Sequence, residues 1–271
     1  MRRPLIEEYP ALVGLRVLTA PNPGLFTLTG TRVHLVGRRQ VAIIDPGPDD
    51  PGHLDRLARL VEDADSVRIL LTHHHADHAE GVQGLSARLG DLTRTEDPSA
   101  VIQGTPIMGA EVDSSIRFEE VQTDAGTLTV IPAPGHAEDH VIFHWAERSA
   151  VFVGDIVLGQ GDTTWLGEYR DCVQDYLGSL DRIQGLGARY LLSAHGDLID
   201  DPTTTIERFR AHRLGRVEEV RAARATYPDA TVLELTRQIY GSLPPGLHRA
   251  AIQGVTAMIA FLDGPEAPLL E

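Results

Sequence analysis

The sequence contains no lysine, since all 24 of its Lys and Arg residues are arginine. This absence excludes a Schiff-base lysine, a phosphate-loop lysine and any other catalytic lysine. Cysteine is nearly absent too, because Cys172 is the only one. No internal disulfide can form, and nothing in the sequence requires an oxidising compartment. We expect Cys172 to be a packing residue of a helix.

Long apolar runs and an excess of positive charge are also missing. No uninterrupted apolar segment approaches the roughly 20 residues of a membrane-spanning helix. Residues 1–8 begin basic and turn acidic before any apolar stretch, which is not the pattern of a signal peptide. The net charge of -15 makes the surface a poor general attractant for nucleic acid. We therefore expect a cytoplasmic protein that does not bind membranes.

The chain is long enough, at 271 residues, for one or two domains. Up to about residue 200, short β-rich segments alternate with helical patterns, which is typical of an α/β protein. From about Pro202 onward only helical periodicity remains. We predict a catalytic domain over residues 1–200 and a small helical domain over residues 201–271. The expected strands are 15–18, 25–28, 33–36, 41–44, 67–71, 128–131, 141–143, 150–153 and 190–193. The expected helices are 51–61, 77–89, 169–183, 205–226, 231–240 and 248–262.

The segment from Thr72 to His78 is the most informative part of the sequence. It follows an apolar predicted strand and places four candidate metal ligands within six residues: His73, His75, Asp77 and His78. Alternate residues of an extended loop can point to one place, which suits a His-x-His pair. His74 lies between the two and is expected at the surface or behind a ligand.

Further candidate ligands also follow apolar strands, namely His136, Asp155 and His195. In α/β folds the loops at strand ends converge and build ligand sites. Five histidines and two aspartates would suit two divalent metal ions. This combination favours zinc, and iron or manganese is compatible with it.

These motifs carry a resemblance to a known family. The segment Thr72-His73-x-His75-x-Asp77-His78 resembles the signature of the metallo-β-lactamase superfamily. Gly135-His136, Gly154-Asp155 and Ala194-His195-Gly196 follow in the family's order, and Asp45-Pro46-Gly47 resembles its preceding turn. The segments 22–31, 135–140 and 154–161 are similar to the β-lactamase-like protein 2 family. After Thr31 that family tends to have Asn, whereas Arg32 stands here.

The resemblance implies a four-layer αββα sandwich with a small C-terminal helical, winged-helix-like module. It also implies roles for individual residues. His73, His75 and His136 would hold one metal, Asp77, His78 and His195 the other, and Asp155 would bridge them. Asp77 would also orient the attacking water as the catalytic residue. Asp45, His140, His212 and Arg213 would support the ligands or contact the substrate.

The implied activity is a dinuclear metal-dependent hydrolase that uses a metal-bridging hydroxide. By the family resemblance it would be a single-strand RNA endonuclease. The alternative is a thioester or ester hydrolase of small acyl substrates, similar to glyoxalase II. A di-iron oxidoreductase and a nucleic-acid-binding module with a structural metal are two further classes. The arginine-rich segment 205–226 is either an RNA contact or a solvated face paired with Glu207, Glu218 and Glu219. The sequence permits a homodimer.

Overall fold

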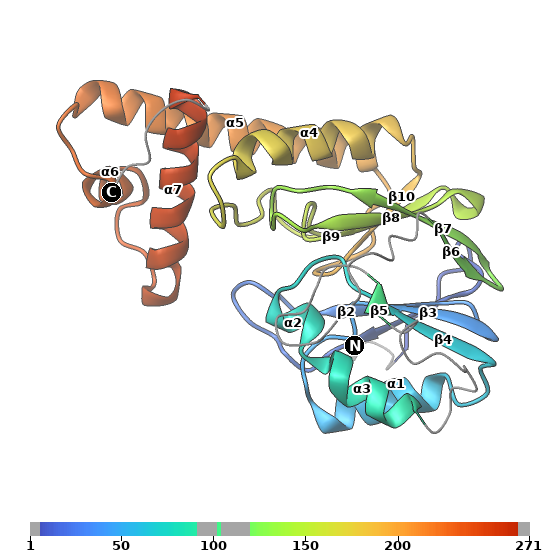
Figure 1. Ribbon diagram of the computed structural model, residues 1–271. Helices are drawn as coiled ribbons and strands as arrows, with labels where there is room; N and C mark the ends of the chain where they lie inside the picture. The colour runs from blue at the N-terminus through green and yellow to red at the C-terminus, as the bar shows by residue number, and fades with distance from the viewer. Residues whose placement is uncertain (1–5, 91–101, 104–119, 265–271) are drawn as a thin grey trace.

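Two five-stranded sheets face each other, and helices cover their outer faces (Figure 1). The computed structural model describes residues 6–90, 102–103 and 120–264. The extreme ends of both predicted domains, residues 1–5 and 265–271, therefore lie outside the described residues. The layers confirm the predicted α/β sandwich.

The first sheet has the order β1-β2-β3-β4-β5. Strands β1, β2 and β3 pair antiparallel, while β3, β4 and β5 pair parallel. Successive side chains of β3 point alternately into two cores. Val41 and Ile43 pack toward α1 and α3, whereas Ala42 and Ile44 pack between the sheets. The elements are β1 (Leu15–Thr19), β2 (Arg32–Val36), β3 (Gln40–Ile44), α1 (Pro51–Leu60), β4 (Ser66–Leu70), α2 (Ala76–Ala79), α3 (Gly81–Leu89) and β5 (Ile102–Gln103).

The second sheet has the order β10-β9-β8-β7-β6, and only β9 and β10 of it pair parallel. Phe152 of β9 belongs to the core between the sheets, and its neighbours Val151 and Val153 face the helices on the other side. The elements are β6 (Glu120–Thr123), β7 (Gly126–Pro132), β8 (Val141–Trp145), the 3-10 helix η2 (Ala146–Arg148), β9 (Ala150–Gly154), α4 (Cys172–Gly185) and β10 (Tyr190–Ser193).

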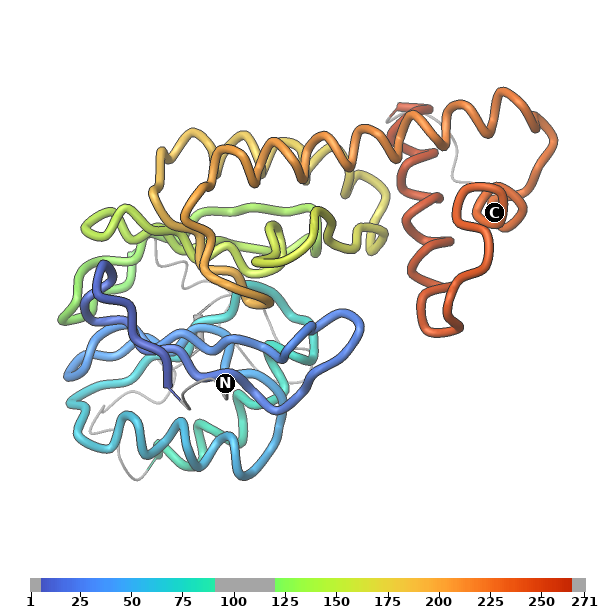
Figure 2. The backbone as a smooth tube through the Cα atoms, turned by 180° about the vertical axis from the view of Figure 1, so that it is seen from behind, coloured from blue at the N-terminus to red at the C-terminus, as the bar shows by residue number. Residues whose placement is uncertain are grey.

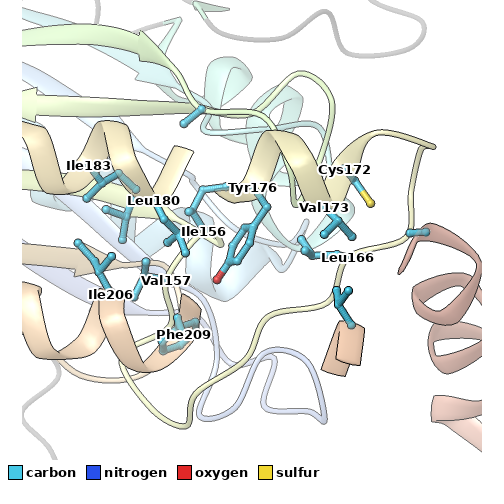
Figure 3. Close-up of a cluster of buried hydrophobic side chains, with 14 of the residues drawn as sticks. Ile156, Val157, Leu166, Cys172, Val173, Tyr176, Leu180, Ile183, Ile206 and Phe209 are labelled. Atoms are coloured by element: carbon cyan, nitrogen blue, oxygen red, sulfur yellow. The ribbon is translucent and has the colours of Figure 1, made fainter. Parts of the chain in front are cut away.

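Helix α4 and the first half of α5 (Pro202–Thr226) cover the outer face of the second sheet. Figure 3 shows their contact, in which Tyr176 and Leu180 of α4 lie beside Ile206 and Phe209 of α5. Cys172 is buried in the same cluster, as expected for a packing residue. Burying side chains of this size stabilises the fold by roughly 1.5–3 kcal/mol each.

The second half of α5 extends past the sheets and carries α6 (Val232–Tyr240), the 3-10 helix η3 (Pro245–Leu247) and α7 (His248–Asp263) (Figure 2). Asp201 caps α5 by accepting a hydrogen bond from the Thr204 N–H, and Thr231 and Glu234 form a capping box on α6. This part is helical, as predicted. Residues 201–264 contain no strand, so this range holds no wing hairpin.

Two local expectations need correction or refinement. The predicted strand 25–28 is a loop, because Pro23 precedes it, Leu28 has φ 55°, and the Gly24 N–H bonds back to Leu28 O. The predicted helix 77–89 is divided into α2 and α3. In the described segments, no helix combines the length and the apolar character needed to cross a membrane.

Candidate metal centre

Four strand ends bring the predicted ligands to one place. The cluster from His73 to His78 follows β4, His136 follows β7, Asp155 follows β9 and His195 follows β10. In the first group, His75 Nδ1 lies 3.0 Å from His73 Nε2 and 2.9 Å from His136 Nε2. Three imidazole nitrogens converge in this group, as a tetrahedral metal site requires.

A second group forms beside the first from Asp77, His78 and His195. Asp77 Oδ2 lies 3.1 Å from His195 Nε2 and 3.4 Å from His78 Nε2. Asp155 Oδ2 lies between the two groups, at 3.5 Å from His195 Nε2, 3.7 Å from His78 Nε2 and 3.6 Å from His136 Nε2. All seven residues predicted as ligands are therefore brought together in one cluster.

Buried polar atoms of this centre indicate that a cation fits it. His78 Nε2, His195 Nε2 and Asp155 Oδ1 are buried and make no aligned hydrogen bond to any residue in the described ranges. Leaving a buried polar atom unsatisfied costs about 1–3 kcal/mol. A cation held by these atoms would remove that cost, and the mixed nitrogen and oxygen donors suit zinc.

The electrostatics of the two groups differ. Burial lowers the pKa of His73, His75 and His136, that of His75 to about 4, so these imidazoles are neutral and can act as ligands. Burial opposes charge at His195 as well, but Asp155 outweighs it and raises the pKa of His195 to about 9. Asp155 and Asp77 thus favour positive charge at this point.

Asp45 lies behind the candidate ligands and contacts Thr72 and His78. Its Oδ1 accepts a hydrogen bond from the Thr72 N–H at 2.8 Å, and its Oδ2 accepts one from Thr72 Oγ1 at 2.8 Å. Asp45 Oδ2 also lies 3.0 Å from His78 Nδ1, and Thr72 Oγ1 lies 3.0 Å from His73 Nδ1. One buried carboxylate thereby orients imidazoles of both groups.

The other predicted supporting residues lie around His136 and Asp155. His140 Nε2 accepts a hydrogen bond from the Asp155 N–H at 3.2 Å. His136 Nδ1 lies 3.0 Å from Trp165 O, which leaves its Nε2 for a metal. Arg213 Nη2 donates to Thr164 O at 2.7 Å and so fixes this loop from α5.

His74 points away from the centre, as expected. Its Nδ1 lies 3.1 Å from Asp139 Oδ2, and its Nε2 lies 3.1 Å from Glu168 Oε1. Glu168 Oε2 is also 3.7 Å from His75 Nε2. Sequence reasoning gave no role to Glu168, Thr164 or Trp165, because the segment that carries them has no periodic pattern. The role of Thr72 was missed as well, although a hydroxyl next to His73 was a usable signal.

A cavity of about 590 Å³ adjoins the centre. Its lining includes His136 and Asp155, together with His212 and Arg213, so the last two face the cavity and not the metal ligands. Apolar side chains from the loop 22–30, from the loop after α6 and from the C-terminal helices line it too, among them Leu25, Phe26, Leu243, Leu247 and Ala250.

Comparisons with known proteins agree with this architecture. The metallo-beta-lactamase superfamily model matches residues 27–195. A beta-lactamase-like protein 2 homolog of Caenorhabditis elegans is 29% identical over 249 residues, which cover 89% of this chain and 81% of that protein. An atrochrysone carboxyl ACP thioesterase of Aspergillus chevalieri is 32% identical over 252 residues, which cover 88% of this chain and 77% of that protein. The crystal structure of a beta-lactamase domain protein from Burkholderia ambifaria has a TM-score of 0.74 at 20% identity, covers 95% of this chain and 87% of that one, and shares the fold. The chain belongs to the metallo-beta-lactamase superfamily.

Proposed function

We propose that this protein is a dinuclear metal-dependent hydrolase of small acyl thioesters. His73, His75 and His136 would hold one divalent ion, Asp77, His78 and His195 a second, and Asp155 would contact both. Zinc is the ion that this donor set suits best. The bound ions would supply a nucleophilic water of lowered pKa and would polarise the acyl carbonyl.

Asp77 is the residue that we assign to orientation of the attacking water. Its side chain is 29% exposed, whereas those of His78, His195 and Asp155 are at most 10% exposed. His195 and His78 outweigh the effect of burial and hold the pKa of Asp77 well below its usual range, so it is a carboxylate. A carboxylate at the open side of the centre can accept hydrogen bonds from a water molecule and so orient it.

The cavity is the observation that carries the choice of substrate. It connects His136 and Asp155 to an apolar wall, and such a wall suits the carbon skeleton of an acyl group. The thioesterase of Aspergillus chevalieri, with 32% identity, supports the same choice.

The arginines of α5 favour this proposal over RNA cleavage. Arg210, Arg221 and Arg224, which do not line the cavity, each form an ion pair, with Asp181, Glu218 and Asp263 respectively, while Arg208 is exposed and has no ion pair with a described residue. Arg213 is buried. Arginines that are paired at the surface or buried beside the cavity are not available to an extended phosphate backbone, and the net charge of -15 opposes its attraction.

The test is to load the purified protein with zinc and assay pentanoyl-coenzyme A, S-pentanoyl-N-acetylcysteamine and a labelled single-stranded oligouridine. We expect thioester turnover that Asp77→Asn lowers by at least about a hundredfold. Asp181→Asn is the matched control, because Asp181 is 72% exposed and pairs only with Arg210 among the contacts described for it.

Salt-sensitive RNA cleavage without thioester turnover would refute the proposal. Bound iron with redox-active absorption and no hydrolysis would instead indicate an oxidoreductase. Metal content measured on the same samples separates these outcomes from incomplete loading.

A further inference from the structure

One side of the cavity carries three basic residues of α5, namely His212, Arg213 and Arg216. Positions 212 and 216, and positions 213 and 216, are neighbours on a helix surface. The other arginines of α5 that form ion pairs, at 210, 221 and 224, do not line the cavity.

Arg213 is a buried charge without a carboxylate partner. The residue is 6% exposed, and no described Asp or Glu lies within ion-pair distance of it. Its guanidinium donates to Thr164 O, lies 5.8 Å from the centre of the Tyr176 ring, and leaves Nε without an acceptor. Buried charges are normally paired, so the fold leaves positive charge uncompensated here.

Arg216 adds to this charge. Its guanidinium lies 4.2 Å from the centre of the Tyr240 ring, and Nη1 donates to Glu219 Oε2 at 2.6 Å. Nη2 is buried and has no acceptor in the described part of the chain, and the same is true of His212 Nδ1. Asp162 also lines the cavity, and Glu219 pairs with Arg216, so the guanidinium of Arg213 is the cation at this wall without a described carboxylate partner.

We propose that this end of the cavity binds an anionic group of the substrate, a carboxylate or a phosphate, while the apolar wall holds the carbon skeleton. The inference rests on the proposed function and specifies its substrate class, namely thioesters that carry a negative group several bonds from the reacting carbonyl. Thr164 links the two parts of the site, because its carbonyl accepts from Arg213 and its Oγ1 lies 3.3 Å from His136 Nδ1. The anion would therefore lie close to the reacting centre, which favours a compact acyl group.

Two sources of the anion are distinguished with matched substrates. S-glutaryl-N-acetylcysteamine and S-pentanoyl-N-acetylcysteamine have the same chain length and differ by a terminal carboxylate. S-pentanoyl-4′-phosphopantetheine and S-pentanoyl-pantetheine differ only by the phosphate of the thiol. We expect one of the two comparisons to show a preference of about ten- to hundredfold in kcat/KM for the charged substrate, as for a hydrogen bond to a charged group.

Arg216→Gln should bring this ratio close to one, because it removes the charge and keeps a polar side chain. Arg221→Gln is the matched control on the same helix, since Arg221 pairs with Glu218 and does not line the cavity; it should retain the ratio. Arg213→Gln is a second variant, used if circular dichroism shows that it folds.

Equal rates in both comparisons, or a preference that survives Arg216→Gln, would overturn the proposal. If no thioester is hydrolysed at all, the proposed function fails while the anion site remains testable. Isothermal titration calorimetry with glutarate and with inorganic phosphate then decides. Binding that Arg216→Gln weakens at least tenfold supports the site, and unchanged or undetectable binding refutes it.

Discussion

Replacing Asp45 with Asn tests whether the carboxylate behind the centre controls metal binding. Asp45 has φ 52°, a left-handed conformation that Asn tolerates better than Ala, so Asp45→Asn limits backbone strain. The amide has one acceptor where the carboxylate has two. In either orientation it places a donor against the Thr72 N–H or against the His78 Nδ1–H, which lie at 2.8 and 3.0 Å from the carboxylate oxygens.

We expect Asp45→Asn to weaken the binding of at least one zinc ion by about 10–100-fold, which is typical for loss of a group that orients a ligand. This corresponds to about 1.4–2.7 kcal/mol. The assay is competition for zinc with a chromophoric chelator, and Asp181→Asn serves as a control for loss of negative charge at an exposed position. Two zinc ions bound with wild-type affinity in a folded Asp45→Asn protein would refute the reasoning.

Three further predictions address the centre and the core. Asp155→Ala should lose at least one of two bound metals, because Asp155 contacts both groups. Metal analysis that finds two ions in the variant would contradict this prediction. Removal of the metals with a chelator should abolish hydrolysis. Gly135→Ala should lower the free energy of unfolding by more than about 1 kcal/mol and so lower the melting temperature. The reason is that Gly135 has φ 140° and the added Cβ would lie 2.6 Å from Tyr176 Cα. An unchanged melting curve would count against this prediction. Burial raises the pKa of the Cys172 thiol from 9.0 to about 11, so this group stabilises the fold fully below pH 9.0 and the contribution is lost as the pH rises through about 11. Iodoacetamide at pH 8 should accordingly label Cys172 only after unfolding, as mass spectrometry can show.

The convergence of the candidate metal ligands could be predicted because each of them follows an apolar strand, and strand ends converge in this class of fold. The order of the motifs along the chain pointed to the family, and the family implied the layers of the fold. Local patterns were sufficient to predict a strand wherever successive side chains alternate between two cores, as from Val41 to Ile44.

Features that depend on contacts distant in sequence could not be predicted in this way. Trp165 owes its place to a hydrogen bond from its Nε1 to Ala250 O at 3.2 Å, across 85 residues of sequence. The composition of residues 25–28 favoured a strand, yet Thr27 Oγ1 donates to Asn22 O at 2.5 Å and closes the segment into a loop. Leu25 and Phe26 are left 66% and 51% exposed at the cavity instead of being buried in a sheet.

The link from Arg213 through Thr164 to the loop beside His136 has a consequence for dissection of the protein. A fragment ending at residue 200 would keep every candidate metal ligand but lose the guanidinium that anchors this loop, together with the Ala250 carbonyl that holds Trp165. Helices α5 to α7 are thus a structural part of the cavity beside the candidate metal centre. Their removal should impair the rate of the proposed reaction as well as the choice of substrate.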